Sequence, residues 1–431
     1  MAYRRRIVDG TLDELFPHLA AIAVEGAKGV GKTATATRHA ATVLSLDNPN
    51  EHAAVAGNLD LVTQVPPPVL IDEWQLEPGV WDRVRRAVDD DSTGGRFLLT
   101  GSAGVAPGVR IHSGAGRIVR MAMRPLAFSE RGVDRPTVSL KDLLGGGGLD
   151  VGGASEVDLP TYTEEILRSG FPGIRDLPER ARRLQLDSYV ERIVERELPE
   201  NGVEVRRPGA LRAWLTAYAA ATATNAAYST ILDAATPGEG DKPARQTVAA
   251  YREQLRRIFV LDPLAAWTPA FAPLKRLTYA PRHHLVDPAL AARLVGIDKA
   301  GLLRGRGTPL GAGRGTRLGA GAGTWLGALF ESLVTQSVRV YAEAADATVG
   351  HLRTKNGDHE IDLVVEGDNW ACVAIEVKLA DVVGDDDVRH LNWLGRQIGD
   401  RLVDRMVIYT GRFAYRRPDG VAVVPLALLG P

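Results

Sequence analysis

Short apolar runs, bounded by polar or turn-forming residues, occur near both ends of the chain. Runs of this kind that are rich in β-branched residues predict buried strands, and they cover residues 22–24, 69–71 and 97–99, then 361–365, 373–377 and 406–409. Between them, apolar side chains recur at helical spacing within residues 186–198, 211–221 and 248–260. The pattern predicts an α/β region, a mostly helical region and a second α/β region.

Two glycine-rich stretches interrupt this pattern. The first holds Gly145 to Gly148 with Gly152 and Gly153, and the second covers residues 301–323. The second stretch carries Arg304, Arg306, Arg314 and Arg317 and no acidic residue. Such a composition is typical of a flexible linker, and its charge would also let it rest against an anion.

Composition limits the kinds of partner and compartment. The 431 residues include 52 Lys and Arg and 53 Asp and Glu, a net charge of −1, so any contact with nucleic acid must come from a local patch. The single cysteine, Cys372, excludes an intrachain disulfide. Because there is also no long apolar run or signal-like start, we expect a cytoplasmic protein without a membrane segment.

A phosphate-binding motif follows the first predicted strand. Gly26-Ala27-Lys28-Gly29-Val30-Gly31-Lys32-Thr33 satisfies the pattern G-x-x-x-x-G-K-[ST], with a helix predicted from Lys32 to about Leu44. In such a loop the glycines let backbone N–H groups point at the phosphates. Lys32 would hold the β and γ phosphates of ATP, and Thr33 would ligate Mg²⁺.

Acidic residues end the second predicted strand, Val69 to Ile71. Parallel sheets bind ligands at the carboxyl ends of their strands, so Asp72 and Glu73 are expected beside the phosphate loop. Asp72 is the candidate for holding Mg²⁺ and its water, and Glu73 is the candidate catalytic base.

Three further residues could serve this site. Thr100 and Ser102 follow the third strand, where their hydroxyls would either lie beside the γ phosphate or cap a turn. Arg117 would either stabilise transition-state charge, as an arginine finger does, or form a surface salt bridge.

The order of these motifs and their residue identities resemble those of the AAA-type ATPases of bacteria and archaea that carry a C-terminal domain of unknown function. The resemblance rests on residues 26–33, on Asp72-Glu73-Trp74-Gln75, on Leu99-Thr100-Gly101-Ser102, and on Gly116-Arg117 followed by Arg124-Pro125-Leu126-Ala127-Phe128-Ser129-Glu130. It continues through Ser169-Gly170-Phe171-Pro172 and the Asp287 segment to Glu360-Ile361-Asp362 and Glu376-Val377-Lys378. The resemblance implies ATP binding. The chain differs from the family at Ala27 and at Thr33-Ala34, where the family often has Arg and Thr-Thr. These differences bear on the expected rate of ATP hydrolysis more than on ATP binding.

A carboxylate and lysine cluster is expected near the C-terminus. Asp362 lies on one predicted strand and Glu376 and Lys378 on the next, where period-two alternation places the last two on one face. The arrangement resembles the PD-(D/E)xK nuclease pattern, in which Asp362 and Glu376 would bind Mg²⁺ and Lys378 would assist, with Glu331 as a fourth member. A five-residue loop between the strands would bring both carboxylates to one face, about two residues apart, whereas a four-residue loop would place them on opposite faces. A β-bulge would also bring them together.

The helical middle offers a candidate nucleic-acid surface. Arg245, Arg252 and Arg256 share one helical stripe, while Val248, Leu255, Ile258 and Phe259 face the core. This arrangement suits a recognition helix of a winged-helix module, which the resemblance also suggests, or a solvated basic face. We expect His283 and His284 to be ordinary surface or core residues, because adjacent side chains point apart.

These features together predict an α/β fold with a parallel P-loop NTPase sheet, a winged-helix-like domain and a restriction-endonuclease-like domain. The expected segments are an ATPase domain at 1–144, a helical domain at 154–300, a Gly/Arg-rich linker at 301–323 and a nuclease-like domain at 324–431. Three classes of function remain open: an ATP-dependent nuclease, a nucleotide-controlled switch that binds DNA or RNA without cutting it, and a scaffold for a protein partner or a homo-oligomer.

Overall fold

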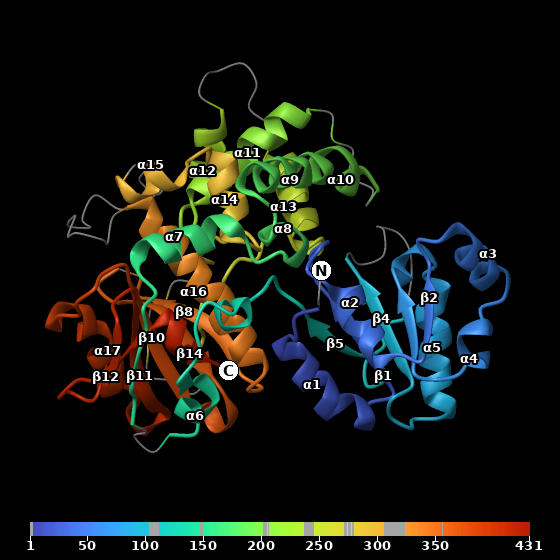
Figure 1. The fold of residues 1–431 in the computed structure, drawn as a ribbon, viewed down its shortest axis with the longest axis horizontal. Helices are drawn as coiled ribbons and strands as arrows, with labels where there is room; N and C mark the ends of the chain where they lie inside the picture. The colour runs from blue at the N-terminus through green and yellow to red at the C-terminus, as the bar shows by residue number, and fades with distance from the viewer. Residues whose placement is uncertain are drawn as a thin grey trace.

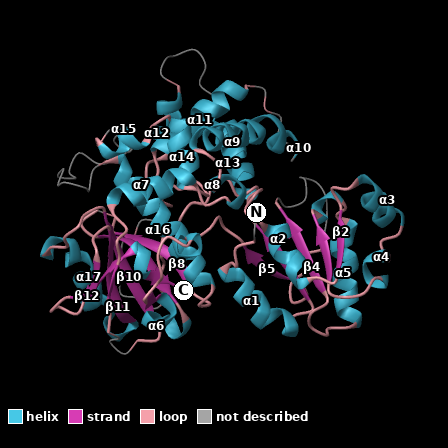
Figure 2. Ribbon diagram, viewed as in Figure 1, coloured by secondary structure: helices cyan, strands magenta, loops and turns pink. Residues whose placement is uncertain are grey.

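The computed structural model describes residues 3–102, 112–146, 150–200, 205, 207–236, 245–270, 274, 277, 280–305, 324–355 and 357–431. These residues form three lobes (Figure 1): an N-terminal sheet with its helices, a helical lobe built from the middle of the chain, and a C-terminal sheet with its helices. Figure 2 shows that the strands lie in the N-terminal and C-terminal lobes. The order of regions predicted from the hydrophobic pattern is therefore confirmed.

The N-terminal lobe is a parallel sheet with the strand order β2-β3-β4-β1-β5. Its strands are β1 (Ala21–Glu25), β2 (Thr42–Ser45), β3 (Val69–Asp72), β4 (Phe97–Gly101) and β5 (Val119–Ala122), and its helices are α1 (Ile7–Leu15), α2 (Lys32–Ala36), α3 (Pro49–Gly57), α4 (Leu61–Gln64) and α5 (Gly79–Asp90). Trp81 and Val84 of α5 belong to the core on one sheet face, and Leu12 of α1 and Ala36 of α2 belong to the core on the other. A parallel sheet covered on both faces explains why its central strands read as continuous apolar runs.

The helix after the phosphate loop is shorter than predicted. It ends at Ala36 and continues as one 3-10 turn, Thr37–His39, instead of reaching Leu44. The chain then forms β2, which pairs with β3 from Thr42↔Val69 to Ser45↔Asp72. The alternating Thr and Ala residues gave no strong helical period, and the sheet pairing decides the conformation of Thr42 and Val43.

The middle lobe is mostly helical, as predicted. It contains α7 (Leu159–Arg168), α8 (Pro172–Arg175), α9 (Glu179–Arg192), the π-helical turn Ile193–Glu197, α10 (Leu198–Glu200), α11 (Pro208–Ala220), α12 (Tyr228–Ala235), α13 (Arg245–Arg257), α14 (Pro288–Val295) and α15 (Lys299–Leu303). Val248, Leu255 and Ile258 are buried, which confirms the predicted core face. His283 and His284 are also buried, and they contact the Ala226 carbonyl and the Ser332 hydroxyl.

The C-terminal lobe is a mixed sheet with the order β7-β12-β13-β11-β10-β9-β8. Its main strands are β8 (Thr348–Arg353), β9 (Glu360–Glu366), β10 (Cys372–Lys378), β11 (Leu402–Tyr409), β12 (Phe413–Arg416) and β13 (Ala422–Pro425). Helix α16 (Trp325–Glu343) packs Leu329 and Leu333 on one face of the sheet. Helix α17 (Asp385–Ile398) packs Leu391 and Leu394 on the other.

The segment after the N-terminal lobe joins the C-terminal lobe. Strand β6 (Val138–Ser139) pairs with β14 (Leu429–Gly430), and β7 (Gly153–Ala154) pairs with β12. Helix α6 (Leu140–Leu144) lies between them in the chain, and Leu140 and Leu143 are buried. Gly153 of the first glycine-rich stretch is thus part of a strand, while residues 147–149 and 306–323 lie outside the described residues.

Within the described ranges, no helix is both long and apolar enough to cross a lipid bilayer.

Candidate nucleotide site and C-terminal acidic cluster

The parallel register collects the predicted ATP-site residues at one edge of the N-terminal sheet. Asp72 pairs with Thr100 across β3 and β4, and Glu25 pairs with Gly101 across β1 and β4. The segments that follow these strands therefore lie beside one another, although they are far apart in sequence. This is the edge at which open α/β sheets bind ligands.

Two glycines of the phosphate loop are required by geometry. A Cβ on Gly26 would lie 2.1 Å from the carbonyl oxygen of Met123, so no other residue fits between the loop and the chain that follows β5. Gly31, which precedes α2, has φ +103°, in the left-handed region that glycine adopts without strain.

Lys32 folds back into the loop. Its ammonium group donates hydrogen bonds to the carbonyl oxygens of Gly26 (2.8 Å) and Ala27 (3.0 Å), and only 5% of the residue is exposed. Burial lowers the pKa of Lys32 to about 8, although Glu73 and Asp72 act in the opposite direction. The Lys32 ammonium group therefore donates to neutral carbonyl oxygens, and negatively charged phosphate oxygens would take their place when a nucleotide binds.

Asp72 joins the phosphate loop to β4. The Thr33 hydroxyl donates to its two carboxylate oxygens at 2.9 and 3.0 Å, and the Thr100 hydroxyl also donates to Oδ1. Hydroxyl and carboxylate oxygens are the ligands that Mg²⁺ prefers, so Thr33 and Asp72 fit a magnesium ion bound directly or through water. Thr100 is thus placed to hold Asp72, rather than to cap a turn.

Glu73 lies just beyond the strand in the left-handed region, with φ 53°. Its Oε2 accepts hydrogen bonds from the Gln75 amide and, at 3.5 Å, from the Ser102 hydroxyl. A non-glycine residue with positive φ at the edge of a sheet is a strained position of the kind found at functional sites. The turn directs Glu73 away from the apolar core toward the same edge as Lys32.

The structure adds Arg6, which sequence reasoning missed. This buried guanidinium donates to the carbonyl oxygens of Val30 (3.0 Å) and Arg124 (2.8 Å) and pairs with Glu130 at 3.0 Å. Arg6 therefore supports the phosphate loop from behind. The Arg124–Glu130 segment, already part of the family resemblance, was the signal that could have pointed to it.

Arg117 is not placed at this site. Its side chain is half exposed and pairs with Asp89 of α5 at 2.7 Å, at the start of β5 rather than its end. Since β5 runs parallel to β1, the full length of a strand separates Arg117 from the phosphate loop. Of the two predicted roles, the geometry matches the surface salt bridge.

The C-terminal cluster is assembled on β9, β10 and α16. A five-residue segment, 367–371, joins β9 to β10, and Cys372 pairs with Glu366, a register whose continuation sets Glu376 opposite Asp362. Lys378 contacts Glu376 at 3.2 Å, and the Val377 N–H donates to Asp362 at 2.8 Å. The predicted hairpin therefore brings its polar residues together where the strands end their pairing.

Arg282 fills this cluster. Its guanidinium, 2% exposed, donates to Asp362 at 2.8 Å and pairs with Glu331 and Glu360. Arg282 reaches the cluster from the middle region, where an antiparallel bridge to Leu264 holds its backbone. A cation that this chain itself supplies thus pairs with Asp362 and Glu331, two of the three carboxylates that the sequence assigned to a metal site.

The ionisation of the cluster reflects burial and this arginine. Burial raises the pKa of Glu331 to about 8, against the effect of Arg282. Burial and then Asp362 raise the pKa of Glu376 well above its usual value. Despite burial, Arg282 and Lys378 hold the pKa of Asp362 below its usual value. Asp362 is therefore the carboxylate that the two cations stabilise most clearly.

The cluster in this arrangement does not fit a divalent metal. In the part of the chain that the structure describes, no group of three or more His, Cys, Asp or Glu side chains could hold a metal ion. The donor set explains this, because Arg282 already binds Asp362 and Glu331 and Lys378 binds Glu376. Guanidinium and metal would compete for the same oxygens.

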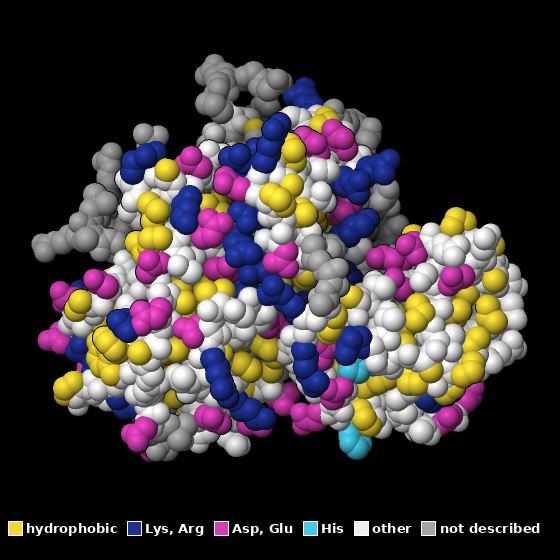
Figure 3. All heavy atoms as spheres, in the orientation of Figure 1, with side chains coloured by type: hydrophobic (Ala, Val, Ile, Leu, Met, Phe, Trp, Pro, Cys, Tyr) yellow, Lys and Arg dark blue, Asp and Glu magenta, His cyan; other side chains and the backbone are white. Residues whose placement is uncertain are grey.

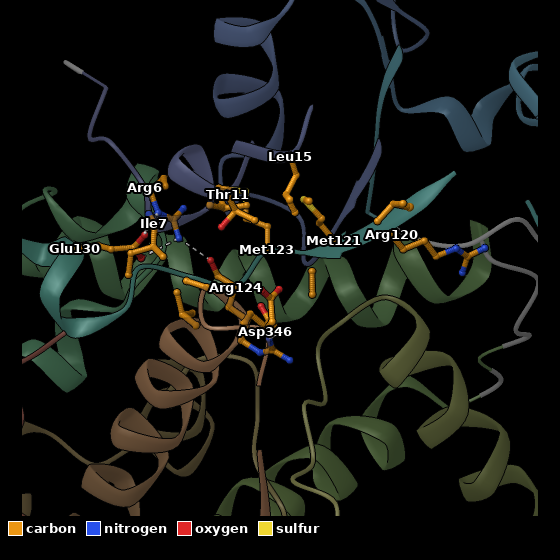
Figure 4. A pocket seen from close by; sticks show the side chains of 16 residues that line it. Arg6, Ile7, Thr11, Leu15, Arg120, Met121, Met123, Arg124, Glu130 and Asp346 are labelled. Carbon is orange, nitrogen blue, oxygen red and sulfur yellow. Dashed lines mark hydrogen bonds and ion pairs between the residues drawn. The ribbon is translucent and has the colours of Figure 1, made fainter. Parts of the chain in front are cut away.

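A separate cavity of about 390 Å³ lies between α1, β5 and the end of α16 (Figure 4). Arg6, Ile7 and Thr11 line it from the side of α1, Met121 from β5, and Asp346 follows α16. No residue of 26–33 lines this cavity, nor do Asp72 and Glu73. It is therefore distinct from the nucleotide site.

The arginine stripe of α13 is divided. Arg245 and Arg256 are exposed, whereas the Arg252 guanidinium lies over the Tyr228 ring at 4.0 Å. On the face drawn in Figure 3, Lys and Arg side chains gather over the helical lobe and toward its junction with the sheets. The helical lobe therefore has an exposed basic surface, although the chain as a whole is nearly neutral.

Comparison with known proteins gives separate family matches for three parts of the chain. Residues 19–132 match a family model described as an AAA domain, and residues 159–301 and 326–429 match models described as domains of unknown function, DUF8612 and DUF4143. No curated protein matches the chain. Among solved structures, a similarity is found to the Walker-type ATPase PABY2304 of Pyrococcus abyssi, at 15% identity and a TM-score of 0.36, over 66% of this chain and 94% of that one. On the family-model match, residues 19–132 of the chain form an AAA-type P-loop domain.

Proposed function

We propose that this chain binds ATP with Mg²⁺ through residues 26–33 and hydrolyses it, with Glu73 as the base that activates water. Asp72 carries this proposal, because it holds the Thr33 hydroxyl and lies at the strand end from which Glu73 projects. Lys32 would exchange its carbonyl acceptors for the β and γ phosphates. The bound Mg²⁺ would neutralise phosphate charge, while Asp72 and Thr33 position it.

Two substitutions test the proposal. Lys32→Ala should abolish ATP binding, measured by calorimetry, whereas Lys141→Ala, at an exposed lysine on α6, should leave it unchanged. Glu73→Gln should retain ATP and lose phosphate release. Unchanged nucleotide affinity in Lys32→Ala would reject the site, and normal turnover in Glu73→Gln would reject Glu73 as the base.

We further propose that the nucleotide state controls how the helical and C-terminal lobes meet a nucleic acid or a protein partner. The order α16-β8-β9-β10-α17-β11, with Asp362, Glu376 and Lys378 at the ends of two strands, supports a nuclease-like fold for the last region. The position of Arg282 favours a nucleotide-controlled switch over an active nuclease, because the arginine already pairs with Asp362, one of the two carboxylates assigned to the metal.

A single assay separates these alternatives. Purified protein is incubated with ATP, Mg²⁺ or Mn²⁺ and plasmid or single-stranded DNA. The switch predicts no cutting that depends on Asp362, and it predicts salt-sensitive binding that weakens when Arg252 and Arg256 are replaced by alanine. Cutting by the wild type that is lost in Asp362→Ala would instead establish the nuclease. Neither cutting nor binding would leave the protein scaffold as the function.

A further inference from the structure

The helical lobe lies directly against the outer side of the phosphate loop. The Tyr189 hydroxyl, on α9, donates to the carbonyl oxygen of Lys28 at 3.1 Å. Phe171 packs against Tyr189, with ring centroids 5.0 Å apart, and a Cβ on Gly29 would be 3.9 Å from the Phe171 ring. A hydrogen bond across 161 positions of sequence thus connects the loop to α9, and the Phe171 ring packs between Tyr189 and the loop at Gly29.

A carboxylate from the same lobe faces the cations of this loop. Glu197 closes the π-helical turn after α9, and its Oε1 lies 4.0 Å from the Lys28 ammonium group. The Glu197 side chain is 13% exposed. After Glu73 and Asp72, it is the next acidic group whose charge raises the pKa of Lys32. Glu197 therefore acts on both lysines of the loop, although it belongs to another region of the chain.

The helical lobe is anchored close to this contact. Gly170 accepts a hydrogen bond from the Leu126 N–H at 2.8 Å and donates one to the buried Asp287 at 2.6 Å. A Cβ on Gly170 would lie within 3.0 Å of Pro125 and Leu126. The chain before α9 is thus fixed to the ATPase lobe, whereas α9 contacts the loop through Tyr189 and the turn at its end faces the loop through Glu197.

We propose that Tyr189 and Glu197 report the occupancy of the phosphate loop to the helical lobe. Phosphate groups bound at Lys32 would bring several negative charges close to the Glu197 carboxylate and compete with it for Lys28 and Lys32. ATP binding would then weaken the hold of the π-helical turn on the loop. This role rests on the proposed ATP site and adds to it a route by which the nucleotide changes the neighbouring lobe.

The competition predicts a charge-specific effect on affinity. Glu197→Gln should tighten binding of the ATP analogue AMP-PNP by about threefold to tenfold at low salt, and the gain should shrink as salt is added. Glu195→Gln removes an exposed charge from the same turn and should leave the affinity unchanged. An unchanged affinity in Glu197→Gln, or an equal gain in both variants, would overturn the competition.

Hydrogen exchange tests the structural half of the proposal. In the wild type, AMP-PNP should lower the protection of backbone amides in residues 186–197. Tyr189→Phe, which keeps the ring, should show reduced protection before nucleotide is added. If the wild type binds AMP-PNP in a Lys32-dependent manner but its protection does not change, the reporting role fails while the ATP site stands. If binding does not depend on Lys32, the proposed function itself fails.

Discussion

The Thr33 hydroxyl donates hydrogen bonds to both carboxylate oxygens of Asp72, at 2.9 and 3.0 Å, across 39 positions of sequence. The parallel register of β1, β3 and β4 produces this contact, because it brings the ends of the three strands to one edge. The Thr33 hydroxyl at the start of α2 and the Asp72 carboxylate at the end of the buried strand β3 thereby form an oxygen pair of the kind that Mg²⁺ prefers.

Thr33→Val should separate binding of the nucleotide from binding of the metal. The valine keeps the shape of the side chain and removes the oxygen, so ATP affinity in Mg²⁺ should fall by about tenfold, the loss of roughly 1.4 kcal/mol. Affinity in EDTA should stay close to that of the wild type. Calorimetric titrations with and without Mg²⁺ measure both values. Thr37→Val, at the residue that directly follows α2, serves as the control. A loss of ATP affinity in EDTA as large as the loss in Mg²⁺ would contradict the assignment of Thr33 as a metal ligand.

ATP binding should weaken as the pH rises through the pKa of Lys32. Burial sets this pKa to about 8 in the free protein, and bound phosphates raise it, so binding takes up a proton above pH 8. The affinity should therefore fall about tenfold between pH 7 and pH 9. Lys32→Arg keeps its charge over this range, so its profile should be flat even if its affinity is lower. A wild-type profile as flat as that of the arginine variant would show that Lys32 does not titrate here.

Local patterns in the sequence predicted the elements that carry the candidate nucleotide site. Residues 26–33 and the strands ending at Asp72 and Gly101 follow from an eight-residue motif and from apolar runs that only a doubly covered parallel sheet needs. The end of α2 was wrong, because pairing of β2 with β3 outweighs the weak helical preference of residues 37–44. The interaction that decides the conformation of these residues is therefore pairing with a strand distant in sequence, which a local pattern does not show.

Arg282 illustrates what the sequence could not provide. Its partners Glu331, Glu360 and Asp362 are 49, 78 and 80 positions away, and no motif surrounds it. The pattern of carboxylates and lysine on β9 and β10 is the same whether a metal or an arginine lies among them. Only the packing of the middle region against the C-terminal sheet distinguishes the two.

Removing Arg282 should destabilise the protein strongly. Arg282→Gln leaves buried carboxylates without their cation, which costs about 3–5 kcal/mol for a buried pair. The loss should be smaller at pH 5 than at pH 7, because protonation of the freed carboxyl groups relieves their repulsion. Denaturant midpoints at the two pH values measure this. Arg293→Gln breaks the partly exposed pair with Asp187 and should cost less than about 1 kcal/mol. Similar losses in the two variants would contradict the role of Arg282 as the cation of the cluster.

Gly26→Ala tests the shape of the phosphate loop without changing any charge. The new methyl group would lie 2.1 Å from the Met123 carbonyl oxygen, which is a backbone atom and not the end of a flexible side chain. The Met123 N–H donates to the Glu25 carbonyl at 2.7 Å, so the chain after β5 cannot retreat without losing that bond. We expect a loss of about 1–3 kcal/mol in stability, as for an overpacked core, and weaker ATP binding because the displaced loop no longer aims its N–H groups at the phosphates.

Gly10→Ala is the matched control, since its methyl group would meet no atom within 4 Å and a glycine inside α1 costs stability by itself. It should leave ATP affinity unchanged and stability equal or higher. Wild-type ATP affinity in Gly26→Ala would mean that the loop binds phosphate in a conformation different from the one described.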